Sequence, residues 1–190
     1  MAEFDQLFTV VNTEYEELRD EFAEQERVRA EQERLRRLAE LAQLSGAGAG
    51  ATATQTAGFV CFFNSPYRFT NDWGDARSGG RQHKGTDVVA AYGQSVKAVA
   101  NGTVLKRNSD LGGISLWLDA DNGTSYYYAH LSGYADGISD GSRVLAGQVI
   151  AYNGDSGNAT GGVPHVHFQI HPGGRGNPPV NPYPTLVEHC

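Results

Sequence analysis

The first 45 residues contain no glycine, proline, cysteine, histidine or tryptophan. All six histidines, both cysteines, both tryptophans and all seven prolines follow residue 56. Imidazole and thiol groups supply most transition-metal ligands in proteins and many catalytic bases and nucleophiles. Chemistry of this kind is therefore confined to the C-terminal part of the chain.

A surplus of basic residues is also absent. Residues 1–45 hold 12 Asp and Glu against 6 Lys and Arg, and residues 46–190 hold 10 against 9, giving a net charge of −7 at pH 7. Proteins that bind nucleic acid usually present a basic patch or stripe to the phosphates. The acidic balance predicts that nucleic acid is not a partner.

Long apolar runs are missing too. A membrane-spanning helix needs about 20 consecutive, mostly apolar residues, and no segment of this chain approaches that length. The sequence that begins at Met1 lacks the basic and apolar regions of a secretory signal. We therefore expect no transmembrane segment, and no signal peptide is visible in this chain.

The composition divides the chain into three parts. In residues 1–45 apolar side chains recur in steps of three and four, at Leu7, Val11, Tyr15, Leu18 and Phe22. Such a stripe predicts an amphipathic helix, either in a coiled coil or packed on another surface. Residues 46–57 are small and predict a flexible linker. We expect the helix to self-associate or to bind a partner protein, and residues 58–190 to form the functional domain.

Residues 58–190 contain short runs rich in Val, Ile and Tyr, separated by glycine and asparagine turn signals. Asn101-Gly102 and Asn122-Gly123 each separate two such runs, and Asn-Gly is a strong hairpin signal. No helical pattern interrupts the runs. The predicted fold class is therefore mostly β, an antiparallel β-sheet or sandwich preceded by the long N-terminal α-helix.

Two short motifs carry the candidate chemistry. His83 and Asp87 are four residues apart, in a segment that predicts a loop entering a strand. His165 and His167 lie in a run of alternating polar and apolar residues, so on a strand both imidazoles share one face. Three such nitrogen and oxygen donors with a fourth position left for water are typical of a catalytic zinc site.

The order of the motifs resembles a known family. HxxxD at His83 is followed by Tyr-Ala-His-Leu around His130 and then by HxH at His165, over roughly residues 59–185. This arrangement resembles the lysostaphin-type zinc metallopeptidases. The resemblance implies a duplicated hybrid motif fold, an endopeptidase activity on cross-links or stem peptides of bacterial peptidoglycan, and an extracellular or cell-envelope location.

The resemblance also implies roles for five residues. It assigns Zn²⁺ to His83, Asp87 and His167, and leaves His130 and His165 as catalytic histidines. Such a site keeps a net positive charge, which lowers the pKa of a bound water to about 7. His165 is two residues from a ligand on the same face, close enough to accept a proton or to stabilise an oxyanion. Which histidine is the base stays open.

Other functions are weighed against this one. Family members that regulate other cell-wall hydrolases pair coiled coils with a degenerate domain, and a phage tail-associated lysin would share the zinc chemistry. All five motif residues are intact here, which favours catalysis. The segment from Gly154 to Gly157, Gly-Asp-Ser-Gly, resembles the nucleophile segment of chymotrypsin-like proteases, but the order and context needed for a serine mechanism are wrong.

We assign no catalytic or metal-binding role to His171, Tyr126 or Tyr128, which lie near the motifs in the sequence. His171 precedes Pro-Gly-Gly and is expected in a solvated turn. Tyr126 and Tyr128 alternate with His130, so they either line the groove or simply pack in the sheet.

Two further sets leave alternatives open. Cys61 and Cys190 form either a disulfide or two separate thiols. Asn71, Arg77 and Arg81 either contact substrate or belong to a flexible loop, and we leave them out of the predicted site.

Overall fold

The computed structural model describes residues 30, 33 and 59–190. The helix predicted at 1–45 and the linker at 46–57 lie outside the described residues, apart from Ala30 and Glu33, and stay predictions. Among the described residues, no helix is both long enough and apolar enough to cross a membrane.

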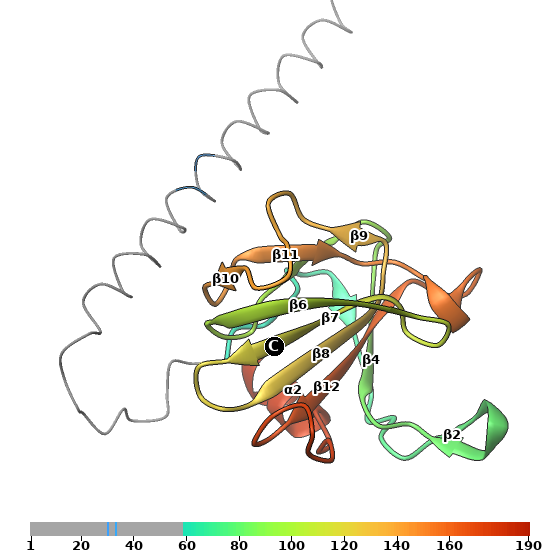
Figure 1. The fold of residues 1–190 in the computed structure, drawn as a ribbon. Coiled ribbons are helices and arrows are strands. Elements are labelled where there is room, and N and C mark those ends of the chain that lie inside the picture. Colours follow the sequence, from blue (N-terminus) through green and yellow to red (C-terminus); the bar gives the residue numbers. More distant parts are fainter. Residues whose placement is uncertain (1–29, 31–32, 34–58) are drawn as a thin grey trace, which may run out of the picture. The chain divides into compact units, whose positions relative to one another are not determined.

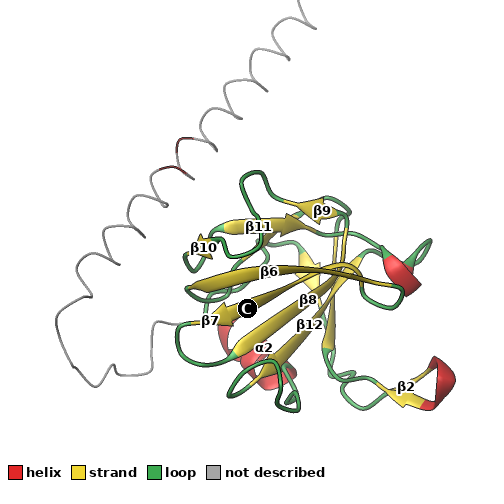
Figure 2. Ribbon diagram, in the orientation of Figure 1, coloured by secondary structure: helices red, strands yellow, loops and turns green. Residues whose placement is uncertain are grey.

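Residues 59–190 form a mostly antiparallel β structure, which confirms the predicted class (Figures 1 and 2). The main sheet has seven strands. In their order across the sheet these are β1 (Tyr67–Arg68), β4 (Thr86–Ala90), β12 (His165–His171), β8 (Ser125–Leu131), β7 (Gly113–Ala120), β6 (Gly102–Ser109) and β10 (Arg143–Val144).

The remaining elements are short. A three-stranded sheet contains β5 (Ser95–Lys97), β11 (Val149–Tyr152) and β9 (Gly133–Tyr134) in that order. Outside both sheets lie the paired strands β2 (Ala76–Arg77) and β3 (Arg81–Gln82), the 3-10 turns η1 (Ser78–Gly80) and η2 (Gly157–Ala159), and helix α2 (Tyr183–His189).

One hydrophobic core lies between the two sheets. Val96 of β5 and Ile150 of β11 belong to the same buried cluster as Val104 of β6 and Phe168 of β12. Each of these side chains is fully buried, and burying an apolar side chain of this size contributes roughly 1.5–3 kcal/mol. The core therefore fixes one face of β12, and the opposite face of that strand is left for other chemistry.

Of the two predicted hairpins, one is confirmed and the other is wrong. The Asn122-Gly123 turn joins the paired strands β7 and β8, as predicted. The Asn101 prediction is wrong, because β5 pairs with β11 while β6 pairs with β7 and β10. Asn101 instead accepts hydrogen bonds from the backbone N–H groups of Ala146 (2.8 Å) and Asp121 (3.0 Å), which hold the chain where it passes from one sheet to the other.

Helix α2 contradicts the expectation of a domain without a helix. Its sequence contains Pro184 and follows Pro182, and prolines usually indicate a loop. Proline is nevertheless tolerated in a first helical turn, where the backbone N–H has no intrahelical partner. Leu186 is fully buried and joins the core, so tertiary packing holds this short helix.

A disulfide joins the beginning of the described domain to its end. Cys61 and Cys190 are bonded across a sequence separation of 129 residues, which settles the alternative left open above. The Tyr67 hydroxyl of β1 donates a hydrogen bond to the Cys190 carbonyl. The disulfide ties the end of α2 to the segment before β1, and the hydrogen bond ties it to β1 itself.

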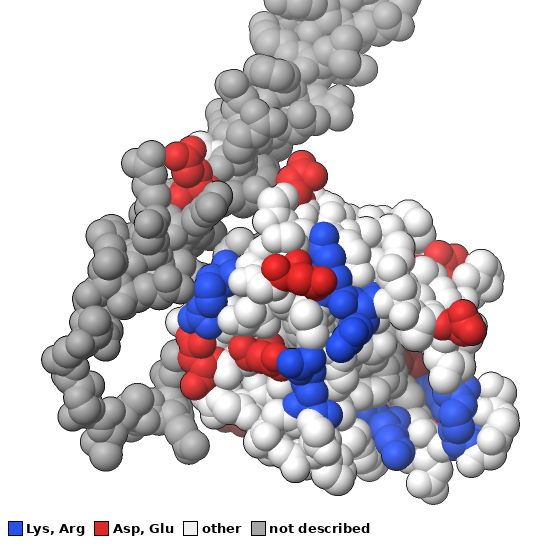
Figure 3. Space-filling view, viewed as in Figure 1, with Lys and Arg blue, Asp and Glu red and all other residues white. Residues whose placement is uncertain are grey.

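Charged side chains of both signs are interspersed on the face shown in Figure 3. Several are paired: Arg143 lies 2.7 Å from Asp121, and Arg175 lies 3.0 Å from Asp119. In these ion pairs the two side-chain charges neutralise each other locally, although the chain as a whole carries a net negative charge.

Candidate active site

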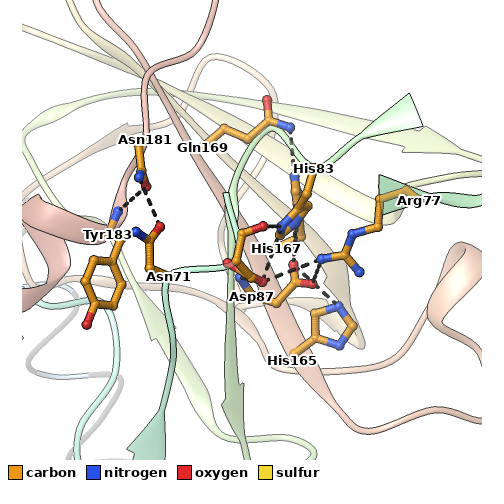
Figure 4. A network of polar contacts seen from close by, with 10 residues as sticks. Asn71, Arg77, His83, Asp87, His165, His167, Gln169, Asn181 and Tyr183 are labelled. Atoms are coloured by element: carbon orange, nitrogen blue, oxygen red, sulfur yellow. Dashed lines mark hydrogen bonds and ion pairs between the residues drawn. The ribbon is translucent and has the colours of Figure 1, made fainter. Parts of the chain in front are cut away.

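The three predicted ligands converge on one point (Figure 4). Nε2 of His83 lies 2.8 Å from Nδ1 of His167, and these two nitrogens lie 3.0 and 2.9 Å from Oδ1 of Asp87. One ligand atom from each residue lies within 4.8 Å of the other two. The set is compact enough to hold one metal ion.

Strand register brings two of these residues together. His167 of β12 is directly opposite Asp87 of β4, and side chains of directly opposite residues in an antiparallel pair project from the same face as neighbours. His83 comes from the loop before β4. Its backbone N–H donates to the Asp75 carbonyl (2.8 Å) and its carbonyl accepts from the Gly74 N–H (2.9 Å), so the loop before β2 fixes its position.

The position of Gly85 within the HxxxD motif requires a residue without a side chain. A Cβ atom at this position would lie 2.5 Å from the Phe168 carbonyl oxygen and 2.6 Å from Cε1 of His167. Both distances are far below van der Waals contact, and β12 cannot move without disturbing the core. Only glycine allows the loop to pass this close to His167.

The electrostatics of the cluster favour a cation. Burial disfavours a charged imidazole at His83, but hydrogen bonds with the carboxylates of Asp72 and Asp87 outweigh it and raise the pKa of His83 to about 9. Burial also acts to raise the pKa of Asp87, while hydrogen bonds with His167 and His83 hold it well below its usual range. A site that stabilises positive charge among three convergent donors fits a divalent metal ion.

Arg77 contacts the other oxygen of Asp87. Its guanidinium donates a hydrogen bond of 2.7 Å to Oδ2, while Oδ1 faces the two imidazoles. Arg77 therefore belongs beside the cluster of His83, Asp87 and His167, although the sequence analysis leaves it out of the predicted site. Asn71 does not approach the cluster, because its side chain pairs with Asn181 (3.0 Å; Figure 4).

His165 lies at the edge of the same cluster. Its Nδ1 donates to the Val163 carbonyl (2.8 Å), which directs the lone pair of a neutral ring to Nε2. That Nε2 is 3.9 Å from Oδ1 of Asp87, and the side chain is 18% exposed. His165 thus directs Nε2 toward the cluster of His83, Asp87 and His167 and remains accessible to solvent.

His130 reaches the site through an unusual backbone conformation. Its φ of 63° lies in the left-handed region, which is uncommon for residues other than glycine. The register between β7 and β8 shifts at this point, and the His130 N–H donates to the Gly112 carbonyl (2.8 Å). The ring consequently lies with its centroid 4.8 Å from that of His165.

This conformation breaks the simple alternation of β8. Tyr126 and Tyr128 are core residues, 5% and 0% exposed, so neither lines the groove. Strict alternation would send His130 into the core with them, but the left-handed residue and the register shift turn it to the other face. Tyr127 lines the cleft instead.

The segment around Ser156 holds His130 and is not a nucleophile site. Nδ1 of His130 donates to the Ser156 carbonyl (2.8 Å), which leaves Nε2 with a lone pair. Burial lowers the pKa of His130 to about 4, so the ring is neutral at pH 7. The Ser156 hydroxyl donates to the Leu131 carbonyl (2.7 Å) and accepts from the Ile114 N–H (2.9 Å), which confirms that the serine mechanism was rightly disfavoured.

All five predicted site residues line a single cleft of about 1040 Å³. Other lining residues come from the β2–β3 arm, from the turn between β6 and β7 and from η2; they include Arg81, Lys84, Ser109, Leu111, Gly112 and Asn158. Arg81 is turned back, since its guanidinium donates to the carbonyl and hydroxyl oxygens of Ser78 (3.1 and 3.2 Å).

His171 contradicts its sequence-based assignment. It lies in β12 rather than in a solvated turn, and it is only 7% exposed. Its ring packs edge-on against Trp117 with centroids 4.8 Å apart. The period-two pattern that predicts His165 and His167 on one face continues through Gln169 to His171, so the sequence carries the signal, although the following Pro-Gly-Gly indicates an earlier strand end.

Comparison with known proteins supplies the family. Residues 81–182 match the family model described as peptidase family M23. The chain is 40% identical over 129 residues to an L-Ala–D-Glu endopeptidase of Bacillus subtilis (strain 168), a match covering 63% of this chain and 40% of that protein. The chain thus spans well under half the length of this relative.

Solved structures share the fold. The catalytic domain of lysostaphin from Staphylococcus simulans superposes with a TM-score of 0.56 and 31% identity, covering 64% of this chain and 92% of that domain. A zinc containing peptidase from Vibrio cholerae superposes with a TM-score of 0.53 and 28% identity, covering 64% and 38%. Because the family match extends over more than half of the sequence and includes every residue of the cluster and both neighbouring histidines, the chain belongs to peptidase family M23.

Proposed function

We propose that this protein is a zinc-dependent endopeptidase that hydrolyses peptide cross-links or stem peptides of bacterial peptidoglycan. The observation that carries the proposal is the convergence of two imidazoles and one carboxylate in an open cleft, with two further imidazoles beside them. The names of the relatives support the substrate class, since one is an L-Ala–D-Glu endopeptidase. The zinc containing peptidase of similar fold supports the metal.

In this proposal His83, Asp87 and His167 hold the metal ion. When bound, zinc polarises the scissile carbonyl and acidifies the attacking water. Arg77 holds the second oxygen of Asp87, so the carboxylate presents a single oxygen to the metal site. With Zn²⁺ bound, two neutral imidazoles and one carboxylate would leave one net positive charge on the site, which makes hydrolysis at neutral pH feasible.

The two remaining histidines have different roles in the proposed reaction. An effective base has a pKa near the working pH, so a pKa of about 4 makes His130 a weak base at pH 7. His165 is better placed, because its Nε2 lies 3.9 Å from Oδ1 of Asp87 and its side chain is accessible to solvent. We assign to His165 the removal of a proton from the attacking water and its delivery to the leaving amine. His130 orients the reacting water or the oxyanion from the other side.

Digestion of defined muropeptides tests the proposal. Zinc-loaded protein should release products whose new amino and carboxyl termini, identified by mass spectrometry, locate the cleaved amide. A zinc chelator should stop the reaction and added zinc should restore it. Zinc-loaded protein that produces no new termini from any muropeptide or from whole peptidoglycan would contradict the proposal.

A non-catalytic regulator of other cell-wall hydrolases is the second candidate. It would bind peptidoglycan without cutting it, so sedimentation with insoluble peptidoglycan in the absence of product favours this reading. The five intact site residues favour catalysis instead. A phage tail-associated lysin would give the same products as the leading proposal, since it differs only in context. Either peptidase would act outside the cytoplasm or in the cell envelope, where its substrate lies.

A further inference from the structure

Four polar side chains follow one another along a single face of β12. Beyond His165 and His167 they are Gln169 and His171. Nε2 of His167 lies 2.8 Å from the side-chain amide of Gln169, and the other end of that amide lies 2.8 Å from Nε2 of His171. A continuous chain of hydrogen bonds therefore leads from a metal ligand to a buried histidine (Figure 4 shows its first contact).

At the far end of these hydrogen bonds, the Asn177 carbonyl determines which ring nitrogen of His171 carries a hydrogen. Its Nδ1 lies 2.7 Å from the carbonyl oxygen of Asn177, which can only accept, so Nδ1 carries a hydrogen. The ring is 7% exposed and burial lowers its pKa, so it is neutral at pH 7. A neutral imidazole protonated at Nδ1 has a lone pair at Nε2 and needs a donor there.

The Gln169 amide has one orientation that meets this need. As drawn, its oxygen faces His171 and its nitrogen faces His167, which would require a buried imidazolium at His171. The two ends of an amide have nearly the same shape, and the partners decide which end points where. With the amide turned by half a rotation, its N–H donates to Nε2 of His171 and its oxygen accepts from Nε2 of His167.

This orientation favours the Nε2–H tautomer of His167. A hydrogen at Nε2 of a neutral ring leaves the Nδ1 lone pair for a metal ion, at the atom that faces Nε2 of His83 (2.8 Å) and the acceptor Oδ1 of Asp87 (2.9 Å). We propose that Gln169 and His171 are positioning residues that hold His167 in the Nε2–H tautomer, so that Nδ1 is ready to bind the metal. The proposal rests on the metal site of the proposed function, but it does not depend on which bond is cleaved.

Contacts around His171 hold its ring in place at the end of the hydrogen bonds that begin at His167. Ile170 forms an isolated bridge with Val180, and the turn that begins at His171 is closed by hydrogen bonds from Gly174 and Asn177 (both 3.1 Å). This turn presents the Asn177 carbonyl to the ring. Partners of metal-binding histidines of this kind typically contribute 10–100-fold to metal affinity.

Nuclear magnetic resonance tests the tautomers directly. In zinc-loaded full-length protein labelled with ¹⁵N, long-range correlations should show His167 protonated at Nε2 and His171 protonated at Nδ1. Zinc on Nε2 of His167, or a hydrogen on Nε2 of His171, would overturn the proposal. This measurement uses the unaltered chain, so it decides the matter even where a variant does not fold.

Zinc affinity supplies the second readout. In competition with a chromophoric chelator, Gln169→Leu should bind zinc about 10–100-fold more weakly. His171→Phe should weaken binding less, because the amide remains but loses the partner that orients it. Gln169→Glu should bind zinc nearly as the parent does, since a carboxylate oxygen still accepts from Nε2 of His167.

Gln148→Leu is the matched control. Its amide oxygen accepts from the Leu145 backbone in the turn before β11 and takes no part in the cleft. Equal zinc affinity in Gln169→Leu and Gln148→Leu would overturn the proposal. The proposed function fails separately, if the unaltered chain binds zinc and shows these tautomers but cleaves no peptidoglycan.

Discussion

Asp72 contacts the Nδ1 edge of His83 with two different oxygens. The backbone carbonyl lies 2.9 Å from Nδ1, and the carboxylate Oδ2 lies 3.3 Å from it. The same Oδ2 accepts a hydrogen bond of 3.2 Å from the Asp87 backbone N–H. One residue of the loop before β2 therefore orients both ends of the HxxxD motif, although it lies outside the motif itself.

Replacing Asp72 should weaken metal binding while keeping the fold. Asp72→Asn preserves the carbonyl contact and the shape of the side chain, but it removes the negative charge beside His83. We expect zinc affinity to fall about tenfold, as for other carboxylate partners of metal-binding histidines. Asp75→Asn, which changes an exposed acid three residues away, is the control. Equal affinities in the two variants would show that Asp72 has no role at the metal site.

The ligand assignment predicts about one zinc ion per chain. His167→Ala and Asp87→Ala should each lose the metal, because either change leaves only two donors where three are needed for a site with one open position. Elemental analysis of purified protein checks both statements. The assignment is wrong if the unaltered protein lacks zinc or if both variants retain it fully.

His165→Ala should separate metal binding from catalysis. The variant keeps all three ligands, so zinc content should match that of the parent. Hydrolysis should fall about 100-fold or more, the usual loss when a proton-transfer or oxyanion-stabilising group is removed. If His165→Ala instead empties the site while His167→Ala does not, the roles of the two strand histidines must be exchanged.

His130 should make the metal-free protein less stable in acid. The pKa of histidine is about 6.5 in an unfolded chain and about 4 for His130 in the folded one. Between these values the unfolded chain binds more protons, so the free energy of unfolding falls as the pH drops from about 6.5 to about 4, by an amount on the order of 3 kcal/mol.

His130→Asn should lose this part of the pH dependence. Asparagine does not titrate, and it tolerates the left-handed backbone better than alanine would. Urea unfolding of metal-free protein at pH 7 and pH 4.5 measures the difference, with His189→Asn in helix α2 as the control. An unchanged slope of stability against pH in His130→Asn would contradict the prediction.

Removal of residues 1–56 should leave a folded, zinc-loaded domain. The predicted helix contains no histidine or cysteine, and a predicted linker separates it from the site. Hydrolysis should be unchanged if the helix only self-associates or tethers the chain, and faster if it shields the cleft. Light-scattering mass and hydrolysis rate of full-length and truncated protein decide between these. Insoluble or metal-free truncated protein would show that the two-part description is wrong.

The sequence predicted the parts of the site that depend on local periodicity. Alternation along β12 correctly placed His165 and His167 on the face opposite Val166 and Phe168. The Asn122-Gly123 turn was predicted correctly because a two-residue hairpin is a local structure.

The remaining features depend on contacts between distant segments. Asp72 approaches His83 only because the β2–β3 arm folds back on the loop before β4. The orientation of His130 depends on a shift in the pairing of β7 with β8, which no pattern within β8 reveals. His171 was misassigned because the Pro-Gly-Gly sequence after it suggested an early strand end, whereas pairing with β8 extends through this residue.

The Cys61–Cys190 bond has a consequence for a protein exposed to other proteases. Every surface loop of the domain lies between the two bonded cysteines. A single cut in any of them, such as the turn after His171, opens a covalent ring and releases no fragment. A clipped molecule would thus keep both pieces together and migrate as one species until a reductant is added.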